Sequence, residues 1–251
     1  QWKSLLTLAL TLVFVLGVFI INRITKLKTP LYIYGGVAVG MFAATTAFEL
    51  SNQVLTIAYT LEAGVVAFLA AYLSGNVKLG QKSSGLLVVP AVMSISSIQS
   101  NAWQSGIMHY DFFVLLVLTL TLLVLGSYFY YKQKIAKDSQ GYDFNFLFWL
   151  FGLYGVALVW KSFHAIITNP DIATMVSLTI YTIVGLIIYI LGKAKEKRDF
   201  LFAGGVVLAG VAIRLLLVDV WNMGITGRII TFFLIGVLFV STAFVSKNSF
   251  N

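Results

Sequence analysis

Six ionisable side chains lie within or beside long apolar stretches of this chain, where they could bind a ligand, carry a proton or hold helices together. They are Glu62, Lys161, His164, Arg214, Asp219 and Arg228. A charge near the centre of a membrane helix costs about 2.5–3.5 kcal/mol on insertion scales, so each of these side chains requires a partner or a role. Their spacing in the sequence separates three candidate sites.

Glu62 lies near the middle of the apolar stretch 54–73, too deep for its short side chain to reach water. A carboxyl group at that depth is either protonated or paired. One interpretation is a proton or cation site in a transport cycle, and the other is a structural carboxyl group hydrogen-bonded to a neighbouring helix. The absence of a second deep carboxylate favours the structural interpretation.

Lys161 and His164 are three residues apart and share one face of a helix, and Arg214 lies near the outer end of a later apolar stretch. Together they could bind an anionic head group or a substrate carboxylate at the outer side of a membrane. Alternatively, the long side chain of Lys161 extends to the outer interface while His164 is hydrogen-bonded among helices. Both interpretations remain open at this point.

Asp219 ends one apolar stretch and Arg228 opens the next. Five residues separate Arg214 from Asp219, which puts them on different sides of a helix, so the expected ion pair is Asp219 with Arg228. Such a pair would brace the outer loop, a structural role more often than a functional one.

No set of residues indicates catalysis. The chain contains no cysteine, its histidines are His109 and His164 alone, and it has no glycine-rich phosphate loop, zinc-protease motif or nucleophile elbow. We therefore expect no metal and no cofactor. Enzymatic activity is left uncertain, with a non-enzymatic role favoured and an intramembrane transferase using His164 as the alternative.

The composition predicts the elements that position these residues. Hydrophobic residues make up 59% of the chain and charged residues 10%, against about 45–50% and about 25% in soluble proteins. This predicts an all-α, polytopic transmembrane helical bundle. About nine spans are expected, near residues 5–21, 31–50, 54–73, 85–98, 112–131, 144–167, 172–191, 200–218 and 227–245.

Basic residues gather in the loops that follow the odd-numbered spans, as in the run from Lys193 to Arg198. The positive-inside rule makes these loops cytoplasmic, with the N-terminus outside and the C-terminus in the cytoplasm. The expected location is the plasma (inner) membrane. Because the basic residues form short clusters between apolar stretches, the net charge of +8 does not indicate binding to nucleic acid.

An internal repeat is expected, because WQSGI at Trp103 recurs as WNMGI at Trp221. The same offset aligns neighbouring segments, which predicts two parallel four-helix repeats related by an axis along the membrane normal. The predicted domains are a leading helix over 1–30, a first repeat over 31–137 and a second over 138–251. The leading helix is similar to the closing span of each repeat, which suggests the C-terminal part of a longer protein; an ordinary N-terminal helix is the alternative.

The segment from Arg214 to Lys247 resembles the end of the many-helix bacterial membrane proteins called domain-of-unknown-function family 2339. Their closing pattern is a basic residue, an apolar stretch, Asp, a short link, Arg and a last apolar helix, and Arg214, Asp219 and Arg228 match it. The resemblance implies architecture and carries no activity.

The sequence therefore leaves two main functional hypotheses. The first is binding or translocation of a small or amphipathic anionic ligand at an outer-side site formed by Lys161, His164 and Arg214. The second is a non-catalytic membrane scaffold or partner-binding subunit, in which all these residues brace helices. The expected partners are membrane lipids and other membrane subunits or further repeats of a longer chain.

Overall fold

The computed structural model describes residues 2–24, 28–135, 146–219 and 224–247, and throughout these ranges the regular secondary structure is helical, with no strand. The all-α prediction is therefore confirmed. Helices long and apolar enough to cross a membrane cover Trp2–Ile21, Asn52–Ser74, Tyr110–Gln133, Phe146–Ile166, Pro170–Ala194 and Arg198–Val218. These six candidate spans indicate a multi-pass membrane protein.

Six candidate spans among the described residues are fewer than the nine predicted from the sequence. One reason is that the predicted span over 85–98 is broken into short segments. The predicted stretches 31–50 and 227–245 coincide with α2 (Lys28–Glu49) and α12 (Ile225–Lys247), whose side chains are described only in part.

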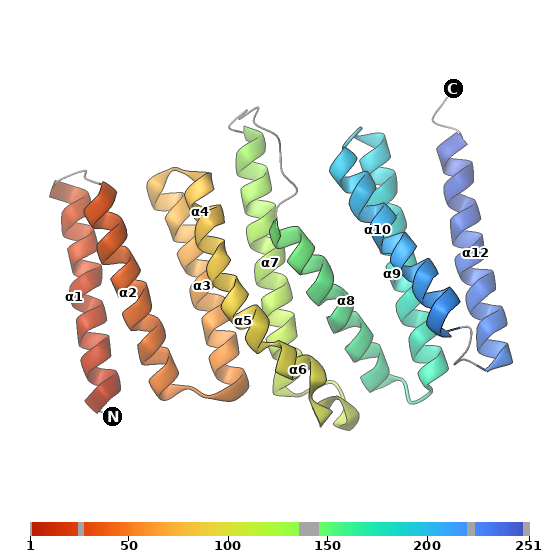
Figure 1. Ribbon diagram of the computed structural model, residues 1–251, viewed down its shortest axis with the longest axis horizontal. Coiled ribbons are helices and arrows are strands. Elements are labelled where there is room, and N and C mark those ends of the chain that lie inside the picture. The colour runs from red at the N-terminus through yellow and green to blue at the C-terminus, as the bar shows by residue number, and fades with distance from the viewer. Residues whose placement is uncertain (1, 25–27, 136–145, 220–223, 248–251) are drawn as a thin grey trace. The chain divides into compact units, whose positions relative to one another are not determined.

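Packing divides the chain into two compact units, one of residues 1–100 with 108–154 and one of residues 101–107 with 155–251. In the first unit, α1 (Trp2–Ile24) and α2 form an antiparallel hairpin, and α3 (Asn52–Ser74) packs against α2 and α7 (Tyr110–Ile135) (Figure 1). The helix α3 ends at Gly75, whose φ of 63° is a left-handed conformation that glycine adopts without strain. The predicted repeat and its domain limits remain predictions.

A series of short helical segments fills residues 77–99 of the first unit. It consists of α4 (Val77–Ser83), η1 (Ser84–Leu87), α5 (Val88–Met93) and α6 (Ile95–Gln99). The series runs back along α3 and reaches α7 (Figure 1). At its breaks, the hydroxyl groups of Ser84 and Ser94 donate to carbonyl oxygens three residues earlier, at 2.6 and 2.7 Å. Serine side chains thus compete locally with the regular helical hydrogen bonds.

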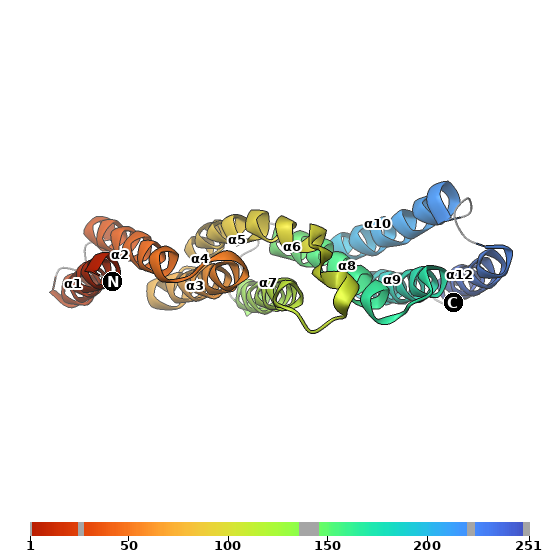
Figure 2. The same cartoon turned by 90° about the horizontal axis from the view of Figure 1, so that it is seen from below.

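The second unit consists of the later part of α8 (Phe146–Ile166), then α9 (Pro170–Ala194), α10 (Arg198–Arg214), the π-helical turn η3 (Leu215–Asp219), α12 and the short helix η2 (Asn101–Ser105). The helix α9 packs against both α10 and α12 (Figure 2). The hydrophobic core of this unit is formed by Leu178, Tyr181, Val211, Leu215 and Ile235. The start of α9 is fixed by Asn169, whose side-chain oxygen accepts a hydrogen bond from the backbone N–H of Asp171 at 2.9 Å.

Glycines allow α9 and α10 to approach closely. A Cβ atom added at Gly204 would lie 2.6 Å from the backbone nitrogen of Tyr189 and 2.8 Å from the carbonyl oxygen of Gly185. Gly205 and Gly210, by contrast, have open space beside them. Small residues at the contact of two helices are the usual means of close packing in membranes. Gly204 is such a residue at the contact of α9 with α10.

Apolar side chains also cover the outward faces of the long helices. In α1, Leu16 and Phe19 are 60% and 70% exposed, and in α10, Phe202 and Ile213 are 64% and 57% exposed. Large apolar side chains exposed in this number are expected where the solvent is lipid rather than water.

Candidate functional site

The predicted residues His164 and Arg214 meet at an aromatic ring in the second unit. The ring of Trp160 stacks against the ring of His164, with centroids 4.1 Å apart and planes inclined by 28°. The guanidinium carbon of Arg214 lies 3.7 Å from the centroid of the Trp160 ring, close enough for a cation–π interaction. Trp160 therefore joins α8 to the end of α10 and is the centre of the candidate site.

Both ring nitrogens of His164 have partners. Nδ1 lies 2.9 Å from the carbonyl oxygen of Trp160, one turn earlier, so it must donate a hydrogen bond there. Nε2 lies 3.3 Å from the hydroxyl oxygen of Thr174, which comes from α9. In the neutral ring Nε2 accepts from that hydroxyl group. His164 thus links α8 to α9.

Lys161 follows Trp160 on the same helix and is half-buried. Within the part of the chain that the structure describes, its side chain takes part in no hydrogen bond or ion pair. Arg214, the other predicted cation, is the last residue before the π-helical turn η3. Its positive charge also acts electrostatically on Tyr181, whose hydroxyl group donates to the carbonyl oxygen of Val156 at 2.6 Å.

The predicted ion pair of Asp219 and Arg228 falls partly outside the described residues, because the side chain of Asp219 is not among them. Another aspartate lies beside the first turn of α12. Oδ2 of Asp171, at the start of α9, accepts a hydrogen bond from the backbone N–H of Gly224 at 3.1 Å. A carboxylate at a helix N-terminus is favourable, because unpaired N–H groups and the helix dipole point toward it.

Glu62 lies in the other unit, on the central part of α3. Its Oε1 atom accepts a short hydrogen bond from the hydroxyl group of Thr46 on α2. One turn away, the hydroxyl group of Tyr59 donates to the carbonyl oxygen of Ala43 at 3.1 Å. Two polar contacts therefore join α2 and α3 at this level.

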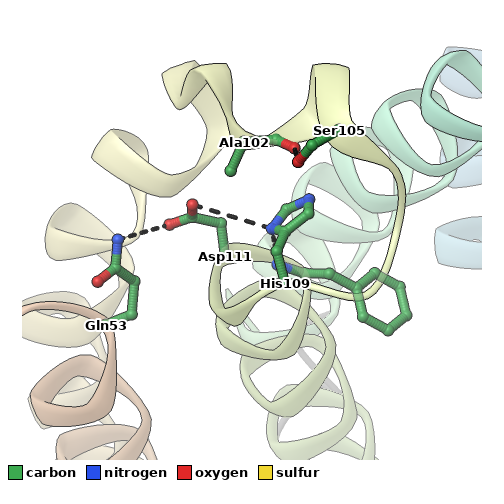
Figure 3. A network of polar contacts seen from close by, with 6 residues as sticks. Gln53, Ala102, Ser105, His109 and Asp111 are labelled. Carbon is green, nitrogen blue, oxygen red and sulfur yellow. Dashed lines mark hydrogen bonds and ion pairs between the residues drawn. The ribbon is translucent and has the colours of Figure 1, made fainter.

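A polar network at the start of α7 lies in the same unit (Figure 3). The side-chain amide of Gln53 on α3 donates to Oδ1 of buried Asp111 at 3.1 Å, and Oδ2 lies 3.9 Å from Nδ1 of His109. That same ring nitrogen accepts a hydrogen bond from the backbone N–H of Phe112 at 3.2 Å. His109 therefore caps α7, while Asp111 holds α7 to α3.

Sequence reasoning missed Trp160 and Thr46 as partners of the predicted residues, and it missed the contact of Asp171 with Gly224. Signals for Trp160 and Asp171 were present. Trp160 precedes His164 by one turn, and Asp171 follows an Asn-Pro pair that is typical of a helix start. Thr46 had no such signal, because it lies four residues before Leu50 in the turn between α2 and α3 whereas Glu62 lies twelve residues after it.

Comparison with protein-family models, with curated proteins and with solved structures found no significant match.

The chemistry of these contacts is that of polar groups satisfied across helix pairs. Among the described residues, no group of three or more His, Asp and Glu side chains is placed to hold a metal ion. The single imidazole at the centre of the site, that of His164, has both nitrogens engaged. What the arrangement can do is hold helices together and present the positive charges of Lys161 and Arg214.

Proposed function

We propose that this chain is a non-catalytic, multi-pass membrane protein that acts as a scaffold or partner-binding subunit, with its intramembrane polar groups bracing neighbouring helices. The observation that carries the proposal is that three of these groups find partners beyond their own helix. Glu62 contacts Thr46, His164 contacts Thr174, and Asp171 contacts Gly224. Its expected partners are membrane lipids and other membrane subunits or further repeats of a longer chain.

The energies of such contacts fit a bracing role. Hydrogen bonds between membrane helices contribute about 0.6 kcal/mol on average and up to about 1.7 kcal/mol. Several of them, distributed over the pairs α2–α3, α3–α7, α8–α9 and α9–α12, would fix which helices are neighbours. A protein that organises other membrane components requires such a defined arrangement more than it requires a reactive group.

Paired variants of His164 test the bracing on which the proposal rests. His164→Leu removes both polar contacts, whereas His164→Gln keeps a donor and an acceptor. We expect the Leu variant to lower the free energy of unfolding by about 1–2 kcal/mol and the Gln variant to lower it by less than about 0.5 kcal/mol, measured by titration with dodecyl sulfate in bicelles. Wild-type stability in both variants would rule out bracing by this side chain.

A second candidate function is binding of a small or amphipathic anionic ligand, or its translocation, at the outer-side site of Lys161, His164 and Arg214. Lys161 favours it, because a half-buried cation in an apolar helix with no partner among the described residues invites an anion. Arg214 adds a second positive charge held on a ring, next to a π-helical turn of the kind frequent at functional sites.

The two candidate functions differ in their response to anionic lipid. If Lys161 binds an anionic head group, phosphatidylglycerol should raise the melting temperature above that in phosphatidylcholine, and Lys161→Gln should abolish the difference. Lys195→Gln, at the exposed turn between α9 and α10, is the matched control because it removes the same charge elsewhere. An equal loss of the difference in both variants would indicate a general charge effect and reject the site.

The proposed architecture has nine spans, with the N-terminus outside, the C-terminus in the cytoplasm and a location in the plasma (inner) membrane. Two observations support it. Described helices coincide with eight of the nine predicted stretches, and the short segments over 77–99 run back along α3 as a ninth crossing would. The basic loops after the odd-numbered stretches set the orientation.

The proposed internal symmetry is two parallel four-helix repeats after a leading helix, supported by the recurring sequence segments. The segment at Trp103 forms η2, and most of its counterpart at Trp221 lies outside the described residues. Similarity to domain-of-unknown-function family 2339 is likewise a proposal, supported by the order of Arg214, Asp219 and Arg228 in the sequence. It would be supported further if longer relatives showed the same closing pattern after additional helices.

A further inference from the structure

Glu62 carries its carboxyl group on an apolar helix, where lipid rather than water is the expected solvent. It lies on the central part of α3, and both Leu61 and Val65 beside it are exposed, at 51% and 55%, on the outward surface of an apolar helix. Glu62 itself is half-buried, and its Oε1 atom accepts from the hydroxyl group of Thr46. The position combines a fixed polar contact with access from the lipid side of the helix.

The described charged groups of the surrounding helices lie away from the level of Glu62, and the titratable side chain nearest to it along α3 is that of Tyr59, one turn earlier. On α2 the carboxylate is Glu49, at the C-terminal end, and on α7 it is Asp111, which is bound by Gln53 about 13 Å along α3 from Glu62. The remaining titratable side chains described on these helices are Tyr34 on α2, Tyr59 and Tyr72 on α3, Lys78 and Lys82 on α4, and Tyr110, Tyr128, Tyr130, Tyr131 and Lys132 on α7.

None of the described basic side chains of these helices is at the level of Glu62. Lys78 and Lys82 follow the end of α3, which is about 18 Å from Glu62 along the helix, and Lys132 is near the end of α7. η1, α5 and α6 carry no Lys, Arg, Asp or Glu. An ionised Glu62 would therefore rely on one hydroxyl donor, that of Thr46, for stabilisation.

A proton satisfies this site better than a metal cation does. A bound Na⁺ would require several oxygen ligands, and the nearby carbonyl oxygen of Ala43 already accepts from Tyr59. A protonated carboxyl group keeps the contact with Thr46 through its carbonyl oxygen and removes the cost of a buried charge. We infer that Glu62 is a proton-binding site within the membrane, with a carboxyl proton that exchanges and that makes this side chain reactive toward apolar carbodiimides.

Dicyclohexylcarbodiimide is the appropriate probe, because it partitions into bilayers and reacts with protonated carboxyl groups. The carboxyl oxygen forms a bond to the central carbon of the reagent while the carboxyl proton moves to a reagent nitrogen, and the adduct rearranges to a stable acylurea. No group leaves and no oxidant is consumed, so the peptide gains the mass of one reagent molecule. Peptide mass spectrometry then identifies the labelled residue.

The experiment uses the full chain in phosphatidylcholine vesicles, with exposed Glu49 as the internal control. At neutral pH we expect at least tenfold more label on Glu62 than on Glu49, and labelling of Glu62 should fall as the pH rises. Replacing choline chloride with sodium chloride at constant pH should leave the labelling unchanged. The variant Glu62→Gln should remove the label from this peptide alone.

Three results would overturn the inference. Equal labelling of Glu62 and Glu49 would mean that Glu62 is ionised or in contact with water, and labelling independent of pH would mean that no exchangeable proton governs the reaction. Protection by sodium would assign the site to a metal cation instead. Each of these results leaves the bracing role of Glu62 and Thr46 untouched, since that role is measured by stability.

Discussion

The guanidinium group of Arg214 lies on the ring of Trp160, which also stacks with His164. One aromatic side chain thus contacts a cation from another helix and an imidazole from its own. A cation–π contact is worth about 0.5–1 kcal/mol at exposed sites and about 2 kcal/mol or more when water is absent, so its strength should depend on the membrane around it.

We expect Arg214→Gln to lower the free energy of unfolding by about 1–2 kcal/mol, because it removes the cation from the ring and keeps a polar side chain of similar length. Dodecyl sulfate titration of the protein in bicelles measures the change.

A double-mutant cycle with Trp160→Leu separates this contact from the general effect of each substitution. A coupling energy of about 0.5 kcal/mol or more is expected between the two positions. Additive effects would show that the contact between the ring and the guanidinium group contributes no stability.

The close contact of α9 with α10 depends on where each glycine points. Gly204 faces the backbone of α9, whereas Gly210 is on the same helix with open space beside it. The two positions therefore form a matched pair, with one substitution that meets a neighbouring helix and one that does not.

Gly204→Ala should lower the free energy of unfolding by about 1–3 kcal/mol, because the added methyl group forces two backbones apart. Gly210→Ala should be neutral or stabilising by up to about 1 kcal/mol, since alanine favours helix and nothing is displaced. Thermal unfolding followed by circular dichroism measures both. Equal effects of the two substitutions would contradict close packing at Gly204.

Helices were predictable from the sequence where apolar residues continue for 18 or more positions, because a bilayer imposes that length. The segment over 77–99 was less predictable. Ser84, Ser94 and Pro90 each alter local hydrogen bonding, and whether the helix breaks there depends on the helices that pack against the segment.

The same limit applies to the candidate site. The depth of Glu62 and the shared face of Lys161 and His164 follow from spacing, whereas the contacts of His164 with Thr174 and of Arg214 with Trp160 require knowledge of which helices are adjacent.

The proposed membrane topology can be tested directly because the chain has no native cysteine. Single cysteines can be placed at exposed positions between the long helices, namely Ser51, Asn76, Gln104, Asn169 and Lys195. A membrane-impermeant maleimide then reports the side of the membrane on which each position lies.

We expect cysteines at Ser51, Gln104 and Asn169 to be labelled in intact cells, and those at Asn76 and Lys195 only after permeabilisation, because basic loops stay in the cytoplasm. Asn76 and Gln104 flank the broken segment and decide whether it crosses. Labelling of both from one side would reject nine spans and make that segment re-entrant.

The carbonyl oxygen of Ala91, in the broken segment, accepts hydrogen bonds from Ser94 at 2.7 Å and from Tyr154 at 2.5 Å. Tyr154 is synthesised 63 residues after Ala91. At about 5–20 residues per second, the segment is exported from the ribosome roughly 3–13 s before this donor exists. The contact between α5 and α8 at Ala91 is therefore made late in synthesis, and until Tyr154 exists the carbonyl oxygen of Ala91 has Ser94 as its side-chain donor.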